Sequence, residues 1–263
     1  PLTARLKLDM SEVCKAVSGW DDKVPGHMLE TWVQNLVQIR LLSEIRVPRN
    51  VGSGIPGCQK FHLVVCTDAS QSIAAAVAYA RSDIGNGKFD CNLIMSKSKL
   101  VLKSTVPRAE LRAATLGASL ARVIRQNLGG MIQSEMFVTD STIAMFWMHQ
   151  DQRPLQLSVR NSVIEIRRLT ELQNWYHTPG TQNPADIPTR PVDVKDFASA
   201  EGEWFKGKEW MRGPVDFMPL KSVAELTLTS EEKRLAAAEI RAKECAGIVL
   251  TCSLQSFQQV QIV

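Results

Sequence analysis

The sequence lacks several features that would assign a protein to a class directly. No apolar stretch approaches the roughly 20 residues that a membrane-spanning helix requires, so we expect no membrane association. None of the six cysteines forms a Cys-x-x-Cys pair, and no Cys/His cluster has zinc-ligand spacing. Because Cys66 lies inside an apolar run, we expect a buried, unreactive thiol there rather than a disulfide or a catalytic cysteine.

The chain also lacks an initiator methionine and a signal-like segment, since it begins at Pro1. We therefore expect it to be a piece of a longer polypeptide that resides in the cytoplasm or the nucleus. Its composition, with 44% hydrophobic and 22% charged residues, is that of a globular protein. The net charge of +4 permits a polyanionic partner but does not require one.

The pattern of apolar residues and chain breakers divides the sequence into three regions. Apolar residues recur every three or four positions at 28–39, which predicts an amphipathic helix around Trp32. Pro48 and the glycine-rich stretch 52–57 then break the chain. Far downstream, the charged stretch 230–246 predicts a solvated helix. The expected regions are 1–57, 58–192 and 193–263, of which the last is a C-terminal extension or linker.

The middle region has the pattern of an α/β domain. The turn Gly85-Asn86-Gly87 joins the second and third of three strand-like runs, which predicts an antiparallel meander. Pro107 opens a helix and Gly129 closes it. The expected strands are 60–67, 72–81, 89–97, 134–139 and 174–177, and the further expected helices are 141–149 and 158–170. This order predicts a mixed sheet with helices on both faces. Trp147 and Trp175 are expected in its core.

Four acidic residues stand out within this region. Asp68 and Asp140 each end an apolar run, where burial disfavours the charged form of a carboxylate. Glu110 lies on the helix that Pro107 opens, on one face with the small residues Ala113, Ala114, Gly117, Ala118 and Ala121. Asp186 follows in a short turn-like stretch. Carboxylates gathered in this way are typical of sites for hard cations such as Mg²⁺.

Several short blocks around these acids are recognisable together. They are Thr67-Asp68-Ala69-Ser70, Thr105-Val106-Pro107-Arg108-Ala109-Glu110-Leu111, Val138-Thr139-Asp140-Ser141, His177-Thr178-Pro179-Gly180 and Asn183-Pro184-Ala185-Asp186. In this order the set resembles the ribonuclease H domain of BEL/Pao-type LTR retrotransposon polyproteins. The blocks at 19–22 and 42–49 resemble the stretch that joins reverse transcriptase to ribonuclease H in that family.

The resemblance implies a ribonuclease H-like fold with a five-stranded mixed sheet, an antiparallel meander plus parallel strands, flanked by helices. It implies an endonuclease that cleaves the RNA strand of RNA–DNA hybrids during reverse transcription. The implied catalytic and metal-binding residues are Asp68, Glu110, Asp140 and Asp186, which would hold two Mg²⁺ ions, with Mn²⁺ as a substitute. The implied partners are the hybrid and the reverse transcriptase and integrase regions of the same polyprotein. The implied location is intracellular, in the cytoplasm, the nucleus or a virus-like particle.

Other residues have weaker claims to a role. His177 precedes Asp186 by nine residues and is a candidate for catalysis or substrate contact, although packing or hydrogen bonding also explains it. Candidates for nucleic-acid binding are Ser70, Arg108, Ser141, Asn183 and Arg190. For the two serines, turn or helix-cap roles are the favoured interpretation, and for the two arginines surface salt bridges are an equal alternative.

Three other functions compete with the nuclease. A domesticated, non-catalytic scaffold that binds nucleic acid or protein would keep the fold without the chemistry. A Pao-type aspartic peptidase would need Asp-Thr-Gly or Asp-Ser-Gly at each catalytic loop, whereas this chain has Asp68-Ala69-Ser70 and Asp140-Ser141-Thr142. A transposase or integrase nuclease of the same fold is a further alternative.

Overall fold

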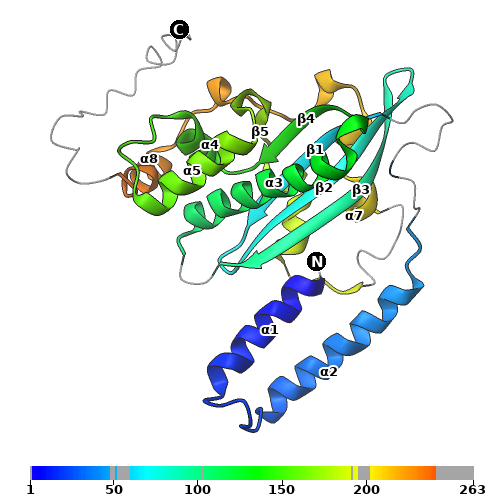
Figure 1. Cartoon of the computed structure of the whole chain (residues 1–263), viewed down its shortest axis with the longest axis vertical. Coiled ribbons are helices and arrows are strands. Elements are labelled where there is room, and N and C mark those ends of the chain that lie inside the picture. The colour runs from blue at the N-terminus through cyan, green and yellow to red at the C-terminus, as the bar shows by residue number, and fades with distance from the viewer. Residues whose placement is uncertain are drawn as a thin grey trace.

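A five-stranded mixed sheet forms the centre of the protein (Figure 1). The structure is a computed structural model that describes residues 2–47, 51, 60–101, 104–190, 192–194 and 202–240. The strands are β1 (Phe61–Ala69), β2 (Ile73–Gly85), β3 (Lys88–Leu100), β4 (Ile132–Thr139) and β5 (Trp175–His177), in the spatial order β3-β2-β1-β4-β5. The pairs β1–β2 and β2–β3 are antiparallel, and β1–β4 and β4–β5 are parallel. This topology confirms the expected sheet.

The hairpin between β2 and β3 follows from its turn residues. Gly85, Asn86 and Gly87 all have positive φ angles, of 89°, 55° and 69°. Glycine and asparagine adopt this left-handed conformation most easily, and it matches the twist of paired strands. Both strands extend beyond the predicted runs, because cross-strand pairing continues from Gly85↔Lys88 to Ile73↔Leu100.

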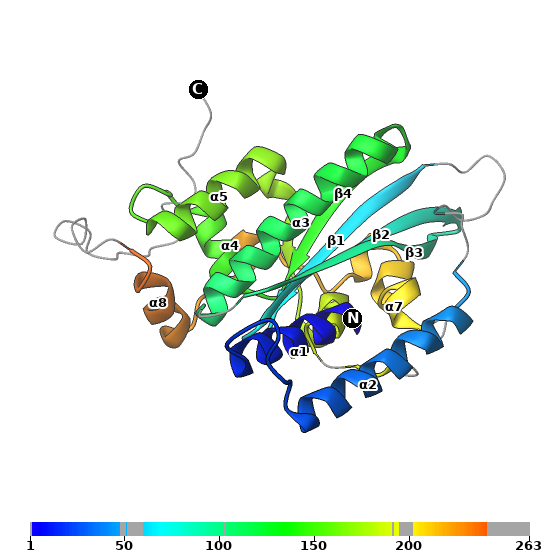
Figure 2. The same cartoon turned by 60° about the horizontal axis from the view of Figure 1, so that its bottom comes forward.

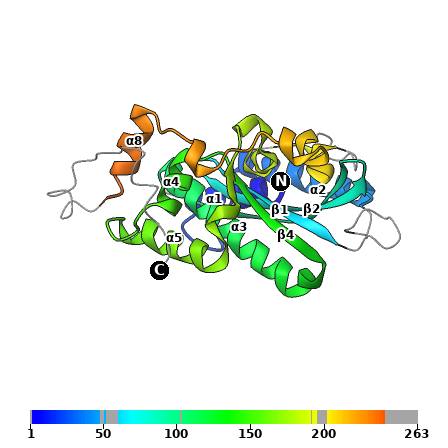
Figure 3. The same cartoon turned by 90° about the horizontal axis from the view of Figure 1, so that it is seen from above.

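Helices cover both faces of the sheet (Figure 2). On one face lie α3 (Val106–Leu128), α4 (Thr142–His149) and α5 (Leu157–Leu169). On the other face lie α1 (Leu2–Ala16), α2 (Gly26–Leu41) and α7 (Glu203–Lys206). The helix α8 (Ser230–Ala237) contacts α4 (Figure 3). Short 3₁₀ turns occur at Leu42–Glu44, Gly129–Met131, Leu172–Asn174, Gly180–Gln182, Pro184–Thr189, Glu209–Arg212, Val215–Phe217 and Val223–Glu225.

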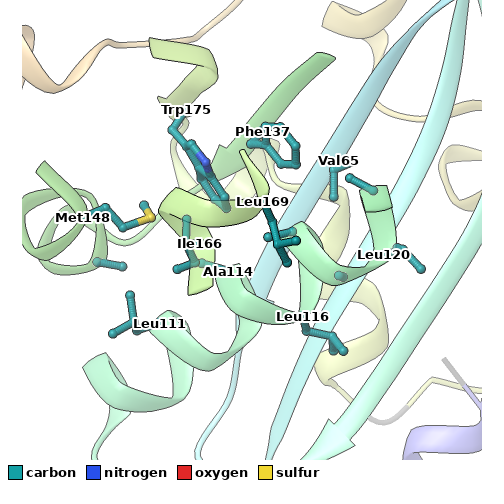
Figure 4. Packing of buried hydrophobic residues seen from close by; sticks show 14 of the residues in the cluster. Val65, Leu111, Ala114, Leu116, Leu120, Phe137, Met148, Ile166, Leu169 and Trp175 are labelled. Carbon is teal, nitrogen blue, oxygen red and sulfur yellow. The ribbon is translucent and has the colours of Figure 1, made fainter. Parts of the chain in front are cut away.

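Side chains of β1 alternate between two hydrophobic cores, as the period of a strand requires. Leu63 and Val65 pack under α3, where Phe137 and Trp175 stack with ring centroids 4.9 Å apart (Figure 4). Val64 and Cys66 point to the opposite face and pack in a cluster with Tyr79, Val138, Trp204, Trp210 and Met211. Trp147, Trp175 and the thiol of Cys66 are all fully buried, as expected.

The close approach of α3 to the sheet depends on Gly117. A Cβ atom at this position would lie 2.4 Å from Cγ2 of Thr67, which is closer than atoms can pack. Ala113, Ala114, Ala118 and Ala121 line the same face and are all fully buried. The small side chains therefore let α3 lie directly on β1 and β2, and this packing carries the first turns of α3 to the tip of β1.

The N-terminal helices keep an exposed apolar surface. Leu29, Val33 and Val37 of α2 are each more than half exposed, at 54%, 51% and 55%. We predict that this apolar surface packs on a neighbouring domain or chain, and the three region boundaries likewise stay predictions. Pro48 and the stretch 52–57 lie outside the described residues. Within the described ranges, no helix has both the length and the apolar character needed to cross a membrane.

Residues 202–240 are packed on the domain, and the helix predicted over 230–246 is present and mostly exposed but shorter. The helix α8 ends at Ala237, and Ala236 is buried in the core beneath α4. Residues 241–246 lie outside the described part of the chain. The charged residues of this stretch gave no sign that Ala236 packs in the core and so attaches the helix to the domain.

We expect Gly117→Ala to lower the free energy of unfolding by about 1–2 kcal/mol, because the clash with Thr67 outweighs the gain in helix propensity. Urea denaturation monitored by circular dichroism measures this. The control is Gly130→Ala, where no atom lies within 4 Å of the added Cβ. Equal stabilities of the two variants would show that α3 does not depend on the close approach.

Candidate active site

Two of the four acids lie side by side at one end of the sheet. Asp68 is the eighth residue of β1, and Asp140 directly follows β4. The parallel register pairs Thr67 with Thr139, so each aspartate comes one residue after a paired position. Adjacent strands are about 4.8 Å apart. The sheet register therefore brings these two carboxylates together. The hydroxyl of Thr67 also donates a hydrogen bond of 3.2 Å to the carbonyl of Val138, which lies 71 positions later in the sequence.

The other two acids reach the same place from α3 and from the loop after β5. Glu110 lies in the second turn of α3 and accepts a hydrogen bond from the hydroxyl of Ser141, which follows Asp140. Asp186 lies in the 3₁₀ turn Pro184–Thr189. Asn183 fixes this turn to the tip of β1, because its amide Nδ2 donates to the carbonyl of Thr67 at 2.9 Å. Its Oδ1 accepts from the backbone N–H of Ala185 at 3.1 Å.

Burial and mutual repulsion raise the pKa values of three of these acids. Burial is the main cause for Glu110, whose pKa rises to about 7, and the charges of Asp140 and Asp68 add to the rise. Burial and the charge of Asp68 raise the pKa of Asp140 to about 7. The pKa of Asp68 also rises, through burial and the charge of Asp186, against a hydrogen bond from Thr189. All four acids are therefore close enough to act on one another electrostatically.

Polar partners hold three of the four carboxylates. The hydroxyl of Thr189 lies 2.5 Å from Oδ2 of Asp68. Ser141 donates to Glu110 as described above, and Nε of Arg190 lies 2.7 Å from Oδ1 of Asp186. Asp140 differs, because its Oδ1 atom is buried and has no hydrogen-bond partner, although the nearby amide of Asn183 lowers the pKa of this carboxyl in part. A buried, unpartnered carboxylate oxygen is costly, so it marks the point where a cation would be most stabilising.

The donor set fits a hard cation, although the side chains are not arranged around one. Within the described residues, no group of three or more His, Cys, Asp and Glu side chains is positioned to hold a metal ion. Asp68, Glu110 and Asp186 instead point to the hydroxyl or guanidinium partners given above. Oxygen-only donors, the unpartnered oxygen of Asp140 and the raised pKa values all suit Mg²⁺ or Mn²⁺. Coordination by three or more of the acids would require these side chains to exchange partners.

His177 fixes the backbone at Asp140. Its Nε2 atom lies 3.0 Å from the carbonyl oxygen of Asp140, so Nε2 carries the proton and donates. Nδ1 is buried and has no partner, and burial lowers the pKa of the ring. The backbone of His177 pairs with Lys221 through two hydrogen bonds of 2.8 Å. This geometry supports a positioning role for His177, and a catalytic role stays a prediction.

The structure gives each of the weaker candidates a defined local contact. Ser70 forms the turn before β2, with its Oγ accepting from the backbone of Ile73 at 3.1 Å. Ser141 caps α4 in addition to binding Glu110. Arg190 is exposed and pairs with Asp186. Nucleic-acid contact by these residues or by Asn183 stays a prediction.

Arg108 is anchored to the C-terminal segment, two residues before Glu110. Its guanidinium forms a two-pronged pair with Glu239 at 2.7 and 2.6 Å, and NH2 also donates to Gln156 at 2.8 Å. Glu239 is only 5% exposed. The hydroxyl of Thr142, next to Ser141, donates to Glu232 of α8. Glu239 thus holds Arg108, two residues before Glu110, and Glu232 holds Thr142, which follows the Ser141 that binds Glu110.

Sequence reasoning missed Thr189, Glu232 and Glu239. The pattern Thr229-x-x-Glu232 is the sequence signature of a capping box, and the structure contains this capping box. Glu232 could therefore have been predicted at the start of a helix. No local signal reveals the pair between Arg108 and Glu239, since 131 residues separate them.

The chain is similar in sequence to one protein family and in fold to several solved structures. The sequence model of a family described as Pao retrotransposon-like RNaseH-like domain matches residues 1–141, which is more than half of the 263 residues. A comparison with curated proteins found no match.

Solved structures show weaker similarity. The N-terminal ribonuclease H domain of a Mycobacterium tuberculosis protein is 13% identical, over 49% of this chain and 94% of that chain, with a TM-score of 0.36. Ribonuclease H1 of the archaeon Halobacterium salinarum is 16% identical over 49% and 92%, with a TM-score of 0.32. A foamy viral protease–reverse transcriptase in complex with RNA/DNA hybrid is 16% identical over 60% and 24%, with a TM-score of 0.34.

The raised pKa values predict how pH affects the stability of the metal-free protein. Folded Asp140 keeps its proton up to about pH 7, whereas an unfolded aspartate loses it near pH 4. The folded state binds more protons in this window, so stability is full below about pH 4 and falls as the pH rises towards 7. Asp140→Asn should remove this loss, so its free energy of unfolding should exceed that of the wild type by on the order of 2 kcal/mol at pH 8. Urea denaturation in EDTA between about pH 5 and 8 measures the difference.

The exposed acid Asp216 provides the control, because Asp216→Asn should leave the pH dependence unchanged. Parallel stability curves for the wild type and Asp140→Asn would show that Asp140 is not under electrostatic strain.

The anchor on Arg108 is tested by Glu239→Gln. Loss of the charge weakens a mostly buried pair, and we expect a loss of about 2 kcal/mol in unfolding free energy with faster amide exchange in the first turn of α3. Denaturation and hydrogen–deuterium exchange measure these effects. Glu231→Gln is the matched control, because Glu231 and its partner Arg234 both lie in α8 and are exposed to solvent, so no measurable change is expected. Unaltered amide exchange in α3 would show that Glu239 does not stabilise the part of the helix that carries Glu110.

Proposed function

The chain belongs to the Pao retrotransposon-like RNaseH-like domain family, and from this premise we propose that it is a metal-dependent endonuclease that cleaves the RNA strand of RNA–DNA hybrids. The observation that carries the proposal is the electrostatic cluster of Asp68, Glu110, Asp140 and Asp186. The acids come from β1, α3, the end of β4 and the loop after β5, yet they meet at one end of the sheet. Folding alone gives no reason to collect like charges there.

The chain's own residues suit a metal site in three ways. Asp140 offers a buried oxygen that has no other partner. Asp68 and Glu110 are held by hydroxyl groups, which can release a carboxylate at little cost. When bound, two Mg²⁺ ions, or Mn²⁺ as a substitute, would activate a water molecule and stabilise the leaving oxygen. Because Glu110 and Asp140 keep their protons up to about pH 7, metal binding should release protons and strengthen as pH rises.

The substrate follows from the family and from the charge of the chain. A net charge of +4 suits a phosphate backbone. The 2′-hydroxyl distinguishes the RNA strand from DNA, and contacts to phosphates position a duplex without reading its sequence. In a retroelement polyprotein the partners would be the reverse transcriptase and integrase regions. The exposed apolar residues of α2 provide a surface on which such a region could pack.

Cleavage of a labelled RNA–DNA hybrid tests the proposal. We expect the wild type to cut the RNA strand with Mg²⁺ or Mn²⁺ and not in EDTA. Asp140→Asn should lower kcat by roughly 10²–10³-fold or more, because it removes a charged group next to the reacting phosphate. Circular dichroism checks that the variant folds, and Asp216→Asn serves as the exposed control.

Two outcomes would contradict the proposal. Undiminished cleavage by Asp140→Asn would place the chemistry elsewhere in the chain. A folded wild type that binds the hybrid but never cuts it, with either metal, would identify a scaffold whose carboxylates no longer act.

A further inference from the structure

The far end of β3 lies on the same rung of the sheet as the carboxylate site. Asp68 pairs with Ala75 of β2, and Ala75 pairs with Ser98 of β3. Asp68 and Ser98 are therefore two strands apart, or roughly 10 Å. Lys97 and Lys99, on either side of Ser98, are both exposed. The register thus places two cations beside the acidic site, at the edge of the sheet.

Both lysines point to the face that α3 covers. Lys97 is paired with Ala76, which packs in the core beneath α3, and Lys99 is paired with Ala74. Ala74 packs with Ala109 and Ala113 of α3, the residues around Glu110. Paired residues of an antiparallel sheet share one face. The two ammonium groups therefore flank the same helix turn that presents Glu110.

A third lysine reaches this place from α1. Nζ of Lys7 donates to the carbonyl oxygen of Ser98 at 2.6 Å and to its hydroxyl at 3.2 Å. Burial, together with the charges of Lys97 and Lys99, lowers the pKa of Lys7, so the three ammonium groups are within electrostatic range. Because β3 is an edge strand, the three lysines surround its free edge from both faces.

The fold does not neutralise these charges. Within the part of the chain that the structure describes, none of the three lysines forms a salt bridge with an acidic side chain. Three like charges at one edge disfavour folding slightly through their repulsion. A polyanion would remove this repulsion and release its own counterions on binding.

We propose that Lys7, Lys97 and Lys99 form a contact surface for the phosphate backbone of a nucleic-acid duplex. They would bind one nucleic-acid strand of the duplex while the other strand lies at the carboxylates. The minor and major grooves of B-DNA are about 6 and 12 Å wide, and the roughly 10 Å between the rung positions of Asp68 and Ser98 is of the same order. One backbone can lie at the acidic site while the other meets the lysines. This inference rests on the proposed function, because that function sets which strand lies at the carboxylates.

Fluorescence anisotropy with a labelled RNA–DNA hybrid in EDTA tests the surface without cleavage. The test variant is Lys97→Ala/Lys99→Ala, and its matched control is Lys88→Ala, at the opposite end of the same strand beside the Gly85 turn. Two lost phosphate contacts should reduce the slope of log affinity against log salt by about 1.8. Between about 50 and 200 mM salt the wild type should then lose about tenfold more affinity than the double variant. Lys88→Ala should match the wild type.

Further variants and a cleavage assay separate the possible failures. Lys97→Arg/Lys99→Arg should restore the wild-type slope, because it keeps the charge. Lys7→Ala should lower the slope further, and thermal denaturation checks that α1 stays folded. The inference would be overturned if the alanine double variant kept the wild-type slope, or if Lys88→Ala reduced the slope as much as the double variant does. Cleavage in Mg²⁺ is scored separately: a chain that binds through the lysines but does not cut the hybrid would overturn the proposed function and leave the surface standing.

Discussion

The contact between α3 and β1 at Gly117 is the constraint on which the rest of the site depends. With no side chain at 117, the helix lies against Thr67, one residue before Asp68. The same approach sets the height of Glu110 above the sheet, where its carboxylate accepts a hydrogen bond from Ser141. A larger residue would lift the whole helix and separate Glu110 from the two strand-tip aspartates. The small side chains of α3 therefore serve the chemistry as much as the core.

Burial of the acids works against folding, and other contacts offset it. Asp68 is only 8% exposed, and burial raises its pKa together with those of Glu110 and Asp140. Nearly all of β1 is buried, and so are the last three residues of β4 before Asp140, so the packing of these segments holds the two aspartates in place against repulsion. Hydroxyl groups and one exposed arginine complete the arrangement. The site thus stores repulsion that a bound cation would relieve.

Most of the sheet and the identity of its acidic tips could be predicted from local patterns. Apolar runs, the Gly-Asn-Gly turn and the N1 proline at 107 each leave a local signal, and the structure confirms the elements that they predict. Contacts between distant segments leave none. The hydrogen bond from Thr189 to Asp68 and the pair between Arg108 and Glu239 join residues 121 and 131 positions apart. The orientation of the carboxylates is likewise a tertiary property, since it depends on which hydroxyl lies nearby.

The bridge between His177 and Lys221 and the anchor at Glu239 have a consequence for the order of events during synthesis. The acidic residues lie between 68 and 186, yet the groups that hold their neighbours extend to 239. Contacts of such long sequence separation form late, and a chain grows from its N-terminus. Before Lys221 and Glu239 have been synthesised, the sheet and α3 can already be in place, but His177 and Arg108 still lack their partners. The supports of the site are therefore completed after the sheet that carries the acidic residues.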